Sequence, residues 1–211
     1  MLIQLAVDRR SIKDALRIAE AARPYIDVLE IGTSYIKDYG MSCIRTVKAA
    51  FPDLTVLADL KTCDEAEYEF RKAFEAGADI ATVMGSASFQ TVSICCETAK
   101  KYSRRAMIDL LECPEERIAW LTALRDAIFC VHISKDSGKT FTGSVVPKVL
   151  KSAGVQIAAA GGVTAAQLPT LAQGGIRLAI IGSAIAGAED VAAAASVLRQ
   201  AADSADHVLQ H

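Results

Sequence analysis

The chain has 211 residues, a formal net charge of -2 and 52% hydrophobic residues, enough for one sizeable core. This small net charge argues against nucleic acid as a partner, and no apolar run approaches the roughly 20 residues that a membrane helix needs. The six cysteines show no Cys-x-x-Cys spacing, so free thiols in a reducing cytosol fit better than disulfides or a zinc site. No basic region precedes the first strand-like run. We therefore expect a cytoplasmic globular protein without a signal peptide.

Short aliphatic segments alternate with longer, alanine-rich amphipathic segments along the whole chain. Ser11 and Asp14 resemble a capping box at the first predicted helix, and Pro114 is typical of a helix first turn. The strand-like segments are Leu2–Val7, Val28–Ile31, Leu54–Ala58, Ile80–Val83, Ala106–Leu110, Ile128–Val131, Gln156–Ala160 and Leu178–Ile181. Eight strands alternating with eight helices predict a single (β/α)8 TIM barrel domain over residues 1–211. A doubly wound open sheet is the less economical alternative.

Two carboxylates and an ammonium group follow the third strand within six residues, at Asp59, Lys61 and Asp64. Residues two apart on an extended chain point to the same face, so we expect Asp59 and Lys61 to project into one site. A surface ion pair at the end of a strand is the alternative for such a motif taken alone.

Other charged side chains stand at equivalent strand ends. These are Asp8 after the first strand, Glu30 in the second, Asp109 in the fifth and His132 after the sixth. In a barrel, the active site lies at the carboxyl ends of the strands, so these groups are expected to converge on one rim. A structural role would be the simpler explanation for His132 alone. Bringing so many charges together costs stability, and function is the usual reason for such a cost.

Glycines mark the ends of the last two strands, at Gly161-Gly162 and at Gly182-Ser183. Glycine lets backbone N–H groups approach a ligand closely, and phosphate sites of these barrels are commonly built after strands 7 and 8. We therefore expect a phosphate group to bind there, held by oriented amides. Tight turns that bind no ligand are the alternative.

Glu30 and Asp59 offer hard oxygen ligands, with water and substrate oxygens left to complete an octahedron. This pattern suits Mg²⁺, which keeps several waters and takes few protein carboxylates. Zinc is a poorer match, because the candidate site has one histidine and no clustered thiolates. A simple ion pair between Glu30 and Lys61 is the alternative.

Several segments resemble the orotidine-phosphate-decarboxylase suprafamily, and the likeness extends over nearly the whole chain. They are Gln4-Leu5-Ala6-Val7-Asp8, Leu29-Glu30-Ile31-Gly32-Thr33, Val56 to Asp64, Glu75-Ala76-Gly77-Ala78-Asp79 and Ala160-Gly161-Gly162. Glu30 is similar to the metal ligand of the branch that contains 3-hexulose-6-phosphate synthases and 3-keto-L-gulonate-6-phosphate decarboxylases. Orotidylate decarboxylases instead have a lysine in this strand.

Membership of that branch implies a sugar-phosphate substrate, Mg²⁺ near Glu30 and Asp59, and a homodimer in which Asp64 completes the neighbouring site. It implies an enediolate stabilised by Mg²⁺ and Lys61, with His132 as proton carrier. Asp8 and Asp64 are then expected to orient Lys61 and the substrate hydroxyls. Asp109 and Lys135 are expected to contact the substrate.

The choice between the two reactions depends on smaller features. Leu60 to Tyr68, Val83 to Ala87, Ile108 to Leu111 and Gly182 to Ile185 look like the synthase. We therefore expect condensation of formaldehyde with ribulose 5-phosphate. Lys135 stands where decarboxylases have an arginine, which keeps decarboxylation of 3-keto-L-gulonate 6-phosphate, or a sugar-phosphate-binding barrel without catalysis, as alternatives. Residues 134–144 form the longest loop on this rim and a candidate lid.

Overall fold

Eight parallel strands close into a barrel in the computed structural model, which describes residues 1–138, 141 and 146–207. Neighbours along the chain are neighbours in space, and β1 closes the ring by pairing with both β2 and β8. The strands are β1 (Leu2–Val7), β2 (Val28–Ile31), β3 (Thr55–Thr62), β4 (Ile80–Met84), β5 (Arg105–Asp109), β6 (Ile128–His132), β7 (Gln156–Ala160) and β8 (Leu178–Ile181). The predicted (β/α)8 barrel is confirmed, and the open sheet is excluded.

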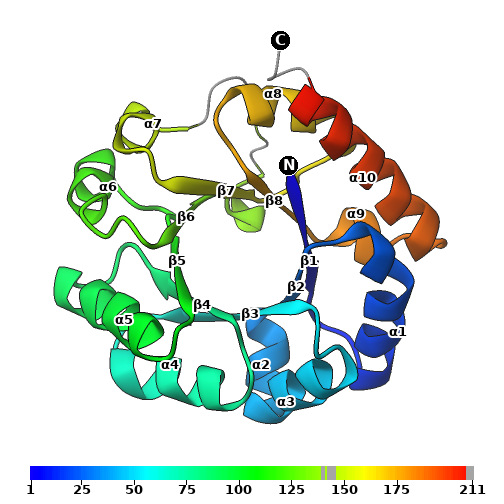
Figure 1. The fold of residues 1–211 in the computed structure, drawn as a ribbon, viewed down its shortest axis with the longest axis horizontal. Helices are drawn as coiled ribbons and strands as arrows, with labels where there is room; N and C mark the ends of the chain where they lie inside the picture. The colour runs from blue at the N-terminus through cyan, green and yellow to red at the C-terminus, as the bar shows by residue number, and fades with distance from the viewer. Residues whose placement is uncertain (139–140, 142–145, 208–211) are drawn as a thin grey trace.

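A ring of helices surrounds the strands (Figure 1). The described residues contain α1 (Ile12–Ala22), α2 (Thr33–Tyr39), α3 (Met41–Ala50), α4 (Ala66–Glu75), α5 (Phe89–Lys101), α6 (Glu115–Leu121), α7 (Lys148–Ala153), α8 (Leu168–Gln173), α9 (Ser183–Ala186) and α10 (Val191–His207). Three short 3-10 helices span Arg23–Tyr25, Lys135–Ser137 and Ala165–Gln167. The two helices beyond the predicted eight arise because Gly40, at φ 60°, divides the connection from β2 to β3, and because α9 precedes α10.

Local signals in the sequence explain where the helices begin. The hydroxyl of Ser11 accepts a hydrogen bond from the Asp14 amide at 3.1 Å and donates to the Asp14 carboxylate, so it caps α1. Pro114 occupies the N-cap position of α6, and Glu115 and Glu116 lie in its first turn, where acidic side chains complement the helix dipole.

The barrel has two apolar layers, one between strands and helices and one inside the ring of strands. Side chains alternate between the two layers along each strand. The inner layer consists of Val28, Leu57, Ile80, Met107, Ile128, Cys130, Ala158, Ala160, Leu178 and Ile180. Among the buried polar residues are Gln4, Glu30, Asp59, Thr82 and Asp109, which belong to five neighbouring strands. A packed apolar interior therefore supports a polar cluster.

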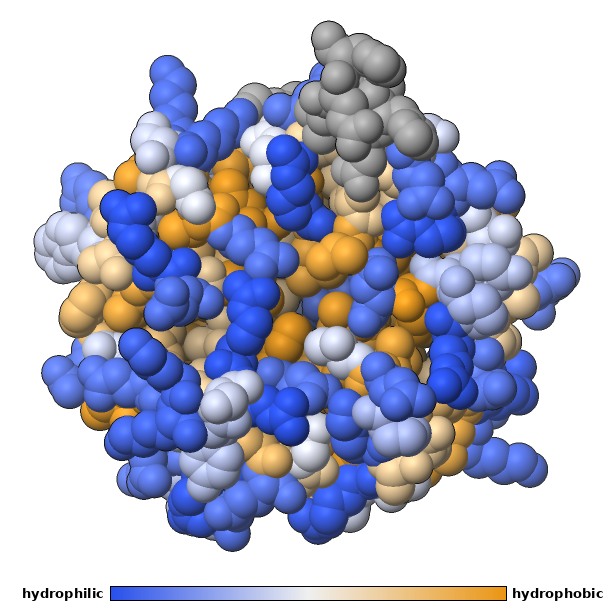
Figure 2. All heavy atoms as spheres, in the orientation of Figure 1, coloured by the Kyte–Doolittle hydropathy of each residue, from blue (hydrophilic) through white to orange (hydrophobic). Residues whose placement is uncertain are grey.

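Polar residues cover much of the face seen in Figure 2, apolar groups gather toward its middle, and the cysteine thiols are not joined in disulfides. Within the described ranges, no helix is long and apolar enough to cross a bilayer. All six cysteines are free, as predicted, with Cys130 buried inside the barrel and Cys63 exposed after β3.

Candidate active site

Three charged side chains and a histidine, from three strands, meet at the carboxyl end of the barrel. Lys61 Nζ lies 2.8 Å from Asp59 Oδ2 and 3.0 Å from Asp109 Oδ2. His132 Nδ1 lies 2.9 Å from the same oxygen of Asp109. The two carboxylates are buried, whereas the Lys61 side chain retains 28% of its exposure and faces the rim. The structure therefore brings together four of the residues that the sequence proposed.

The geometry that brings Asp59 and Lys61 together differs from the simple alternation expected from the sequence. The pairing of β3 with β4 shifts between Ala58 and Thr62, and Lys61 has a left-handed backbone with φ 51°. Few residues other than glycine adopt this conformation. The strand therefore bulges at its carboxyl end, and the bulge, rather than an extended backbone, turns the Lys61 ammonium onto both oxygens of Asp59.

The charge states of the cluster follow from its contacts. Burial opposes the charge on Lys61, but the Asp59 and Asp109 carboxylates outweigh it and raise the pKa of the ammonium group. Burial also acts against ionised Asp109, yet the hydrogen bond from His132 and the nearby Lys61 charge lower the pKa of this carboxyl group. Asp109 is therefore an ionised acceptor, and His132 must donate its Nδ1–H to it. With Nδ1–H directed at Asp109, the lone pair of a neutral imidazole is on Nε2, which can then take a proton.

Glu30 has a different electrostatic environment from the other carboxylates. Its Oε2 accepts a hydrogen bond of 2.5 Å from Gln4 Nε2, inside the barrel. Burial and the neighbouring Asp59 charge raise the pKa of Glu30 to about 8. One ammonium group, on Lys61, faces the carboxyl groups of Asp59, Asp109 and Glu30, so the cluster would have an excess of negative charge if all three were ionised. A divalent cation between Glu30 and Asp59 would balance that excess.

The available oxygen atoms define what kind of cation the cluster can accept. No group of three or more His, Cys, Asp or Glu side chains in the described part of the chain is arranged to hold a metal ion. Two carboxyl groups match the preference of Mg²⁺, which keeps several waters and takes few protein carboxylates, rather than that of zinc. Both oxygens of Asp59 already accept hydrogen bonds from Lys61, so a cation at Asp59 would compete with the Lys61 ammonium for them.

Sequence reasoning missed three polar residues that hold the cluster in place. Thr33 Oγ1 donates to Asp59 Oδ2 at 2.7 Å, Thr82 Oγ1 donates to Asp59 Oδ1 at 2.8 Å, and Gln4 binds Glu30. A signal for two of them was present, because Gln4 and Thr82 are inward-facing polar residues on otherwise apolar strands. Thr33 follows β2 at the start of α2, where no comparable pattern marks it.

Asp8, Asp64 and Lys135 lie on the same rim but outside the hydrogen-bonded cluster. The Asp8 carboxylate accepts from the backbone amides of Arg9 and Tyr35, both at 3.2 Å, so it fixes the start of α2. Asp64 is exposed on the loop after β3, and Lys135 is exposed in the 3-10 helix after β6. The expected roles of Asp8 and Asp64 in orienting Lys61 therefore stay predictions, as does substrate contact by Lys135.

The glycines after β7 and β8 differ in the reason for their presence. Gly161 has φ 107°, and a Cβ there would lie 2.2 Å from the Ile133 carbonyl oxygen, so packing requires glycine. Gly162 has φ 72°, and a Cβ there would meet open space. Gly182 has an ordinary φ of -101° and room for a Cβ, while Ser183 begins the four-residue helix α9. Gly162 is therefore exposed without a neighbouring side chain above it, and Gly182 is partly exposed. The candidate lid at 134–144 lies partly outside the described residues.

The family model described as orotidine 5'-phosphate decarboxylase / HUMPS family matches residues 1–197 of the chain. The chain belongs to this family. The suprafamily resemblance noted in the sequence is thereby confirmed. A 3-hexulose-6-phosphate synthase from Bacillus subtilis is 37% identical over 207 residues, which cover 95% of this chain and 98% of the relative.

Solved structures of the orotidine 5'-phosphate decarboxylase / HUMPS family have the same barrel. A crystal structure of 3-hexulose-6-phosphate synthase aligns with a TM-score of 0.87 at 37% identity, covering 95% of this chain and 99% of that chain. A 3-keto-L-gulonate-6-phosphate decarboxylase from Vibrio cholerae aligns with a TM-score of 0.86 at 28% identity, covering 96% and 97%. Proteins with each of the two activities that the sequence suggested are therefore among the structural relatives.

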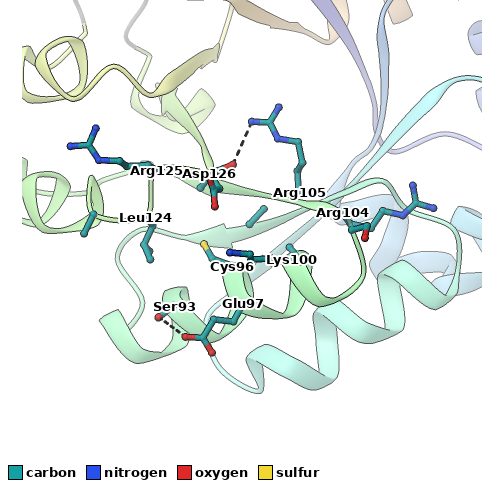
Figure 3. Close-up of a pocket in the computed structure, with 14 residues that line it drawn as sticks. Ser93, Cys96, Glu97, Lys100, Arg104, Arg105, Leu124, Arg125 and Asp126 are labelled. Atoms are coloured by element: carbon teal, nitrogen blue, oxygen red, sulfur yellow. Dashed lines mark hydrogen bonds between the residues drawn. The ribbon is translucent and has the colours of Figure 1, made fainter.

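A hollow of about 750 Å³ lies away from the charged cluster, between α5 and residues 123–127 (Figure 3). It opens at the amino end of β5, beside Arg105, whereas Asp109 is at the carboxyl end of the same strand. Arg105 is bound to the Gln156 side chain and the Asp126 carbonyl, and Arg125 is bound to the Ala153 carbonyl. The hollow is not part of the candidate active site.

Proposed function

We propose that the protein is a lyase of the 3-hexulose-6-phosphate synthase type, which condenses formaldehyde with ribulose 5-phosphate. The observation that supports this most directly is the charged cluster at the strand ends, in which Lys61 is held between Asp59 and Asp109 and His132 is oriented by Asp109. The 37% identity to a synthase over 95% of the chain supports the same reaction.

The cluster can perform the proton transfers that this condensation needs. His132 Nε2 is the atom free to take a proton from C1 of ribulose 5-phosphate, which leaves a 1,2-enediolate. C1 of the enediolate then forms a bond to the carbon of formaldehyde, and the carbonyl oxygen of formaldehyde takes the proton back from His132. Lys61, held as an ammonium ion, donates hydrogen bonds to the oxygen on which negative charge develops. It acts as a fixed cation rather than as a base.

The cofactor that we propose is Mg²⁺, held by Glu30 and Asp59. When bound, it would supply Lewis-acid stabilisation of negative charge on the substrate oxygens. The support for it is the excess of carboxyl groups over ammonium groups around Glu30, whose pKa is raised to about 8 by burial and by the neighbouring Asp59 charge. Gln4 would orient Glu30, and Thr33 would orient Asp59, through the hydrogen bonds described above.

The substrate phosphate is proposed to bind the backbone amides at Gly161, Gly162, Gly182 and Ser183. The open approach at Gly162 and Gly182 supports this position.

A homodimer in which Asp64 enters the neighbouring site is also proposed. Its support is the branch pattern, together with the exposure of Asp64 three residues beyond Lys61.

Decarboxylation of 3-keto-L-gulonate 6-phosphate is the second candidate, favoured by the cation Lys135 at the start of the loop after β6. Purified protein with Mg²⁺ should be assayed in parallel for formaldehyde consumption with ribulose 5-phosphate and for CO₂ release from 3-keto-L-gulonate 6-phosphate. We expect formaldehyde consumption. Release of CO₂ without formaldehyde turnover would reassign the protein to the decarboxylases, and turnover of neither substrate would leave only sugar-phosphate binding.

A further inference from the structure

Thr82 is a buried polar residue in the middle of an apolar strand. It lies on β4, where its neighbours Ala81 and Val83 are fully buried, and its own exposed fraction is 3%. Burying a hydroxyl group is unfavourable unless it finds hydrogen-bond partners, so its partners indicate why a threonine is present.

The Thr82 hydroxyl joins two parts of the charged cluster. It donates its single proton to Asp59 Oδ1 at 2.8 Å and accepts a hydrogen bond of 2.9 Å from the backbone N–H of Lys61. Both roles of the hydroxyl are therefore used at once. One side chain on β4 thus holds the Asp59 carboxylate and the main chain of Lys61 on the neighbouring strand.

The break in pairing between β3 and β4 explains why the Lys61 amide needs this partner. Ala58 pairs with Ala81 and Thr62 with Val83, so four steps along β3 face only two steps along β4. Thr82 is the residue opposite the extra length. In a regular parallel pair, a backbone carbonyl of the neighbouring strand would accept the hydrogen bond of the Lys61 amide, and here the Thr82 hydroxyl accepts it instead. The φ of 51° at Lys61 is rare for a residue with a side chain.

We infer that Thr82 is a positioning residue, which fixes the left-handed turn at Lys61 and the Asp59 carboxylate as one unit and thereby aims the ammonium group at the reacting oxygen. The kinetic part of this inference rests on the proposed function. Thr82 itself is screened from the substrate by its burial, so it acts through Asp59 and Lys61.

The test is Thr82→Val, which keeps the shape of the side chain and removes the hydroxyl. The variant loses the hydrogen bond that stabilises the charged Asp59 carboxylate. The free energy of such a bond corresponds to a decrease in kcat of about 10- to 100-fold, with little change in KM. Independently of turnover, competitive acetylation with mass spectrometry should show Lys61 reacting about tenfold faster relative to exposed Lys135, because a Lys61 side chain that is no longer held in place by the turn opens more often to the reagent.

Two further variants separate positioning from packing. Thr82→Ser retains the hydroxyl and should keep both kcat and Lys61 acetylation near the values of the unchanged protein. Thr98→Val is the matched control, because the Thr98 hydroxyl is buried in α5 without a hydrogen-bond partner in the described structure. It should leave both readouts unchanged. If Thr82→Val is not recovered folded, Thr82→Ala replaces it.

The inference is overturned if a folded Thr82→Val protein keeps either its kcat or its Lys61 acetylation within twofold of the unchanged protein. It is also overturned if Thr82→Ser is as impaired as Thr82→Val, because the methyl group would then be the determinant. Should the unchanged protein fail to turn over formaldehyde and ribulose 5-phosphate, the proposed function falls, and the acetylation of Lys61 alone decides the role of Thr82.

Discussion

Replacing Glu30 by glutamine should stabilise the metal-free protein, and the stabilisation should grow with pH. The folded protein retains the Glu30 proton up to about pH 8, whereas the carboxyl group ordinarily ionises near pH 4.5. Between these values the folded state binds more protons than the unfolded chain, so the free energy of unfolding falls as the pH rises. Glu30→Gln removes this loss, because a neutral amide has no proton to release.

The size of the effect follows from the two pKa values. Each pH unit of difference corresponds to about 1.4 kcal/mol, so Glu30→Gln should gain about 3 kcal/mol over the unchanged protein between pH 5 and pH 8. For a chain of this length, 1 kcal/mol shifts Tm by roughly 2–4 °C, which gives a growing Tm difference of roughly 6–12 °C. The hydrogen bond that Gln4 donates can be kept, because the amide oxygen of glutamine is also an acceptor.

Thermal unfolding followed by circular dichroism at pH 5 and pH 8, at fixed protein concentration and with EDTA present, measures this difference. Glu20→Gln is the matched control, since Glu20 is an exposed residue of α1 far from the cluster. Its Tm should follow that of the unchanged protein at both pH values. Parallel Tm curves for Glu30→Gln and the unchanged protein would refute the burial argument. Addition of Mg²⁺ should then raise Tm at pH 8 in the unchanged protein but not in Glu30→Gln.

Three further outcomes are expected. Mixing inactive Asp64→Asn with inactive Lys61→Ala subunits should restore part of the activity through hybrid sites, and mixtures that stay inactive after demonstrated subunit exchange would exclude a shared site. Gly182→Ala should keep the Tm unchanged, because its Cβ would lie 3.7 Å from the nearest atom, yet raise KM about tenfold by obstructing the phosphate; an unchanged KM would move the phosphate elsewhere. Removal of divalent cations with EDTA should abolish turnover and Mg²⁺ should restore it, whereas full activity in EDTA would remove Glu30 and Asp59 from the role of metal ligands.

The strands of this protein could be predicted from sequence because each is a short aliphatic run between amphipathic helices. The observed strands differ from the predicted ones only in where they begin and end. For example, β3 begins at Thr55 and continues through the charged motif to Thr62. The division of the β2–β3 connection into α2 and α3 was missed, since its signal is the single Gly40 within a continuous amphipathic stretch. Strand periodicity is a local property and therefore survives in the sequence.

The membership of the charged cluster was predictable, but its connections were not. Position at a strand end was enough to nominate Asp59, Lys61, Asp109 and His132. That Lys61 would contact both Asp59 and Asp109 depends on a bulge and on a positive φ, which result from pairing with β4 rather than from residues 59–64 themselves. The hydrogen bond from the Lys61 amide to the Thr82 hydroxyl was equally unpredictable, because it joins residues that are distant in sequence.

The close approach of Ile133 to Gly161 limits how this barrel can be redesigned. The Ile133 carbonyl occupies the space where a side chain at position 161 would be, and the Ile133 amide bonds the Ala160 carbonyl at 2.9 Å. The sequences of the loop after β6 and of the turn after β7 therefore depend on each other, and a change in one restricts the residues allowed in the other. A loop exchanged at 133–138 to convert one reaction into the other should fold only together with a glycine at 161, and a library that varies the two segments separately would consist mostly of misfolded chains.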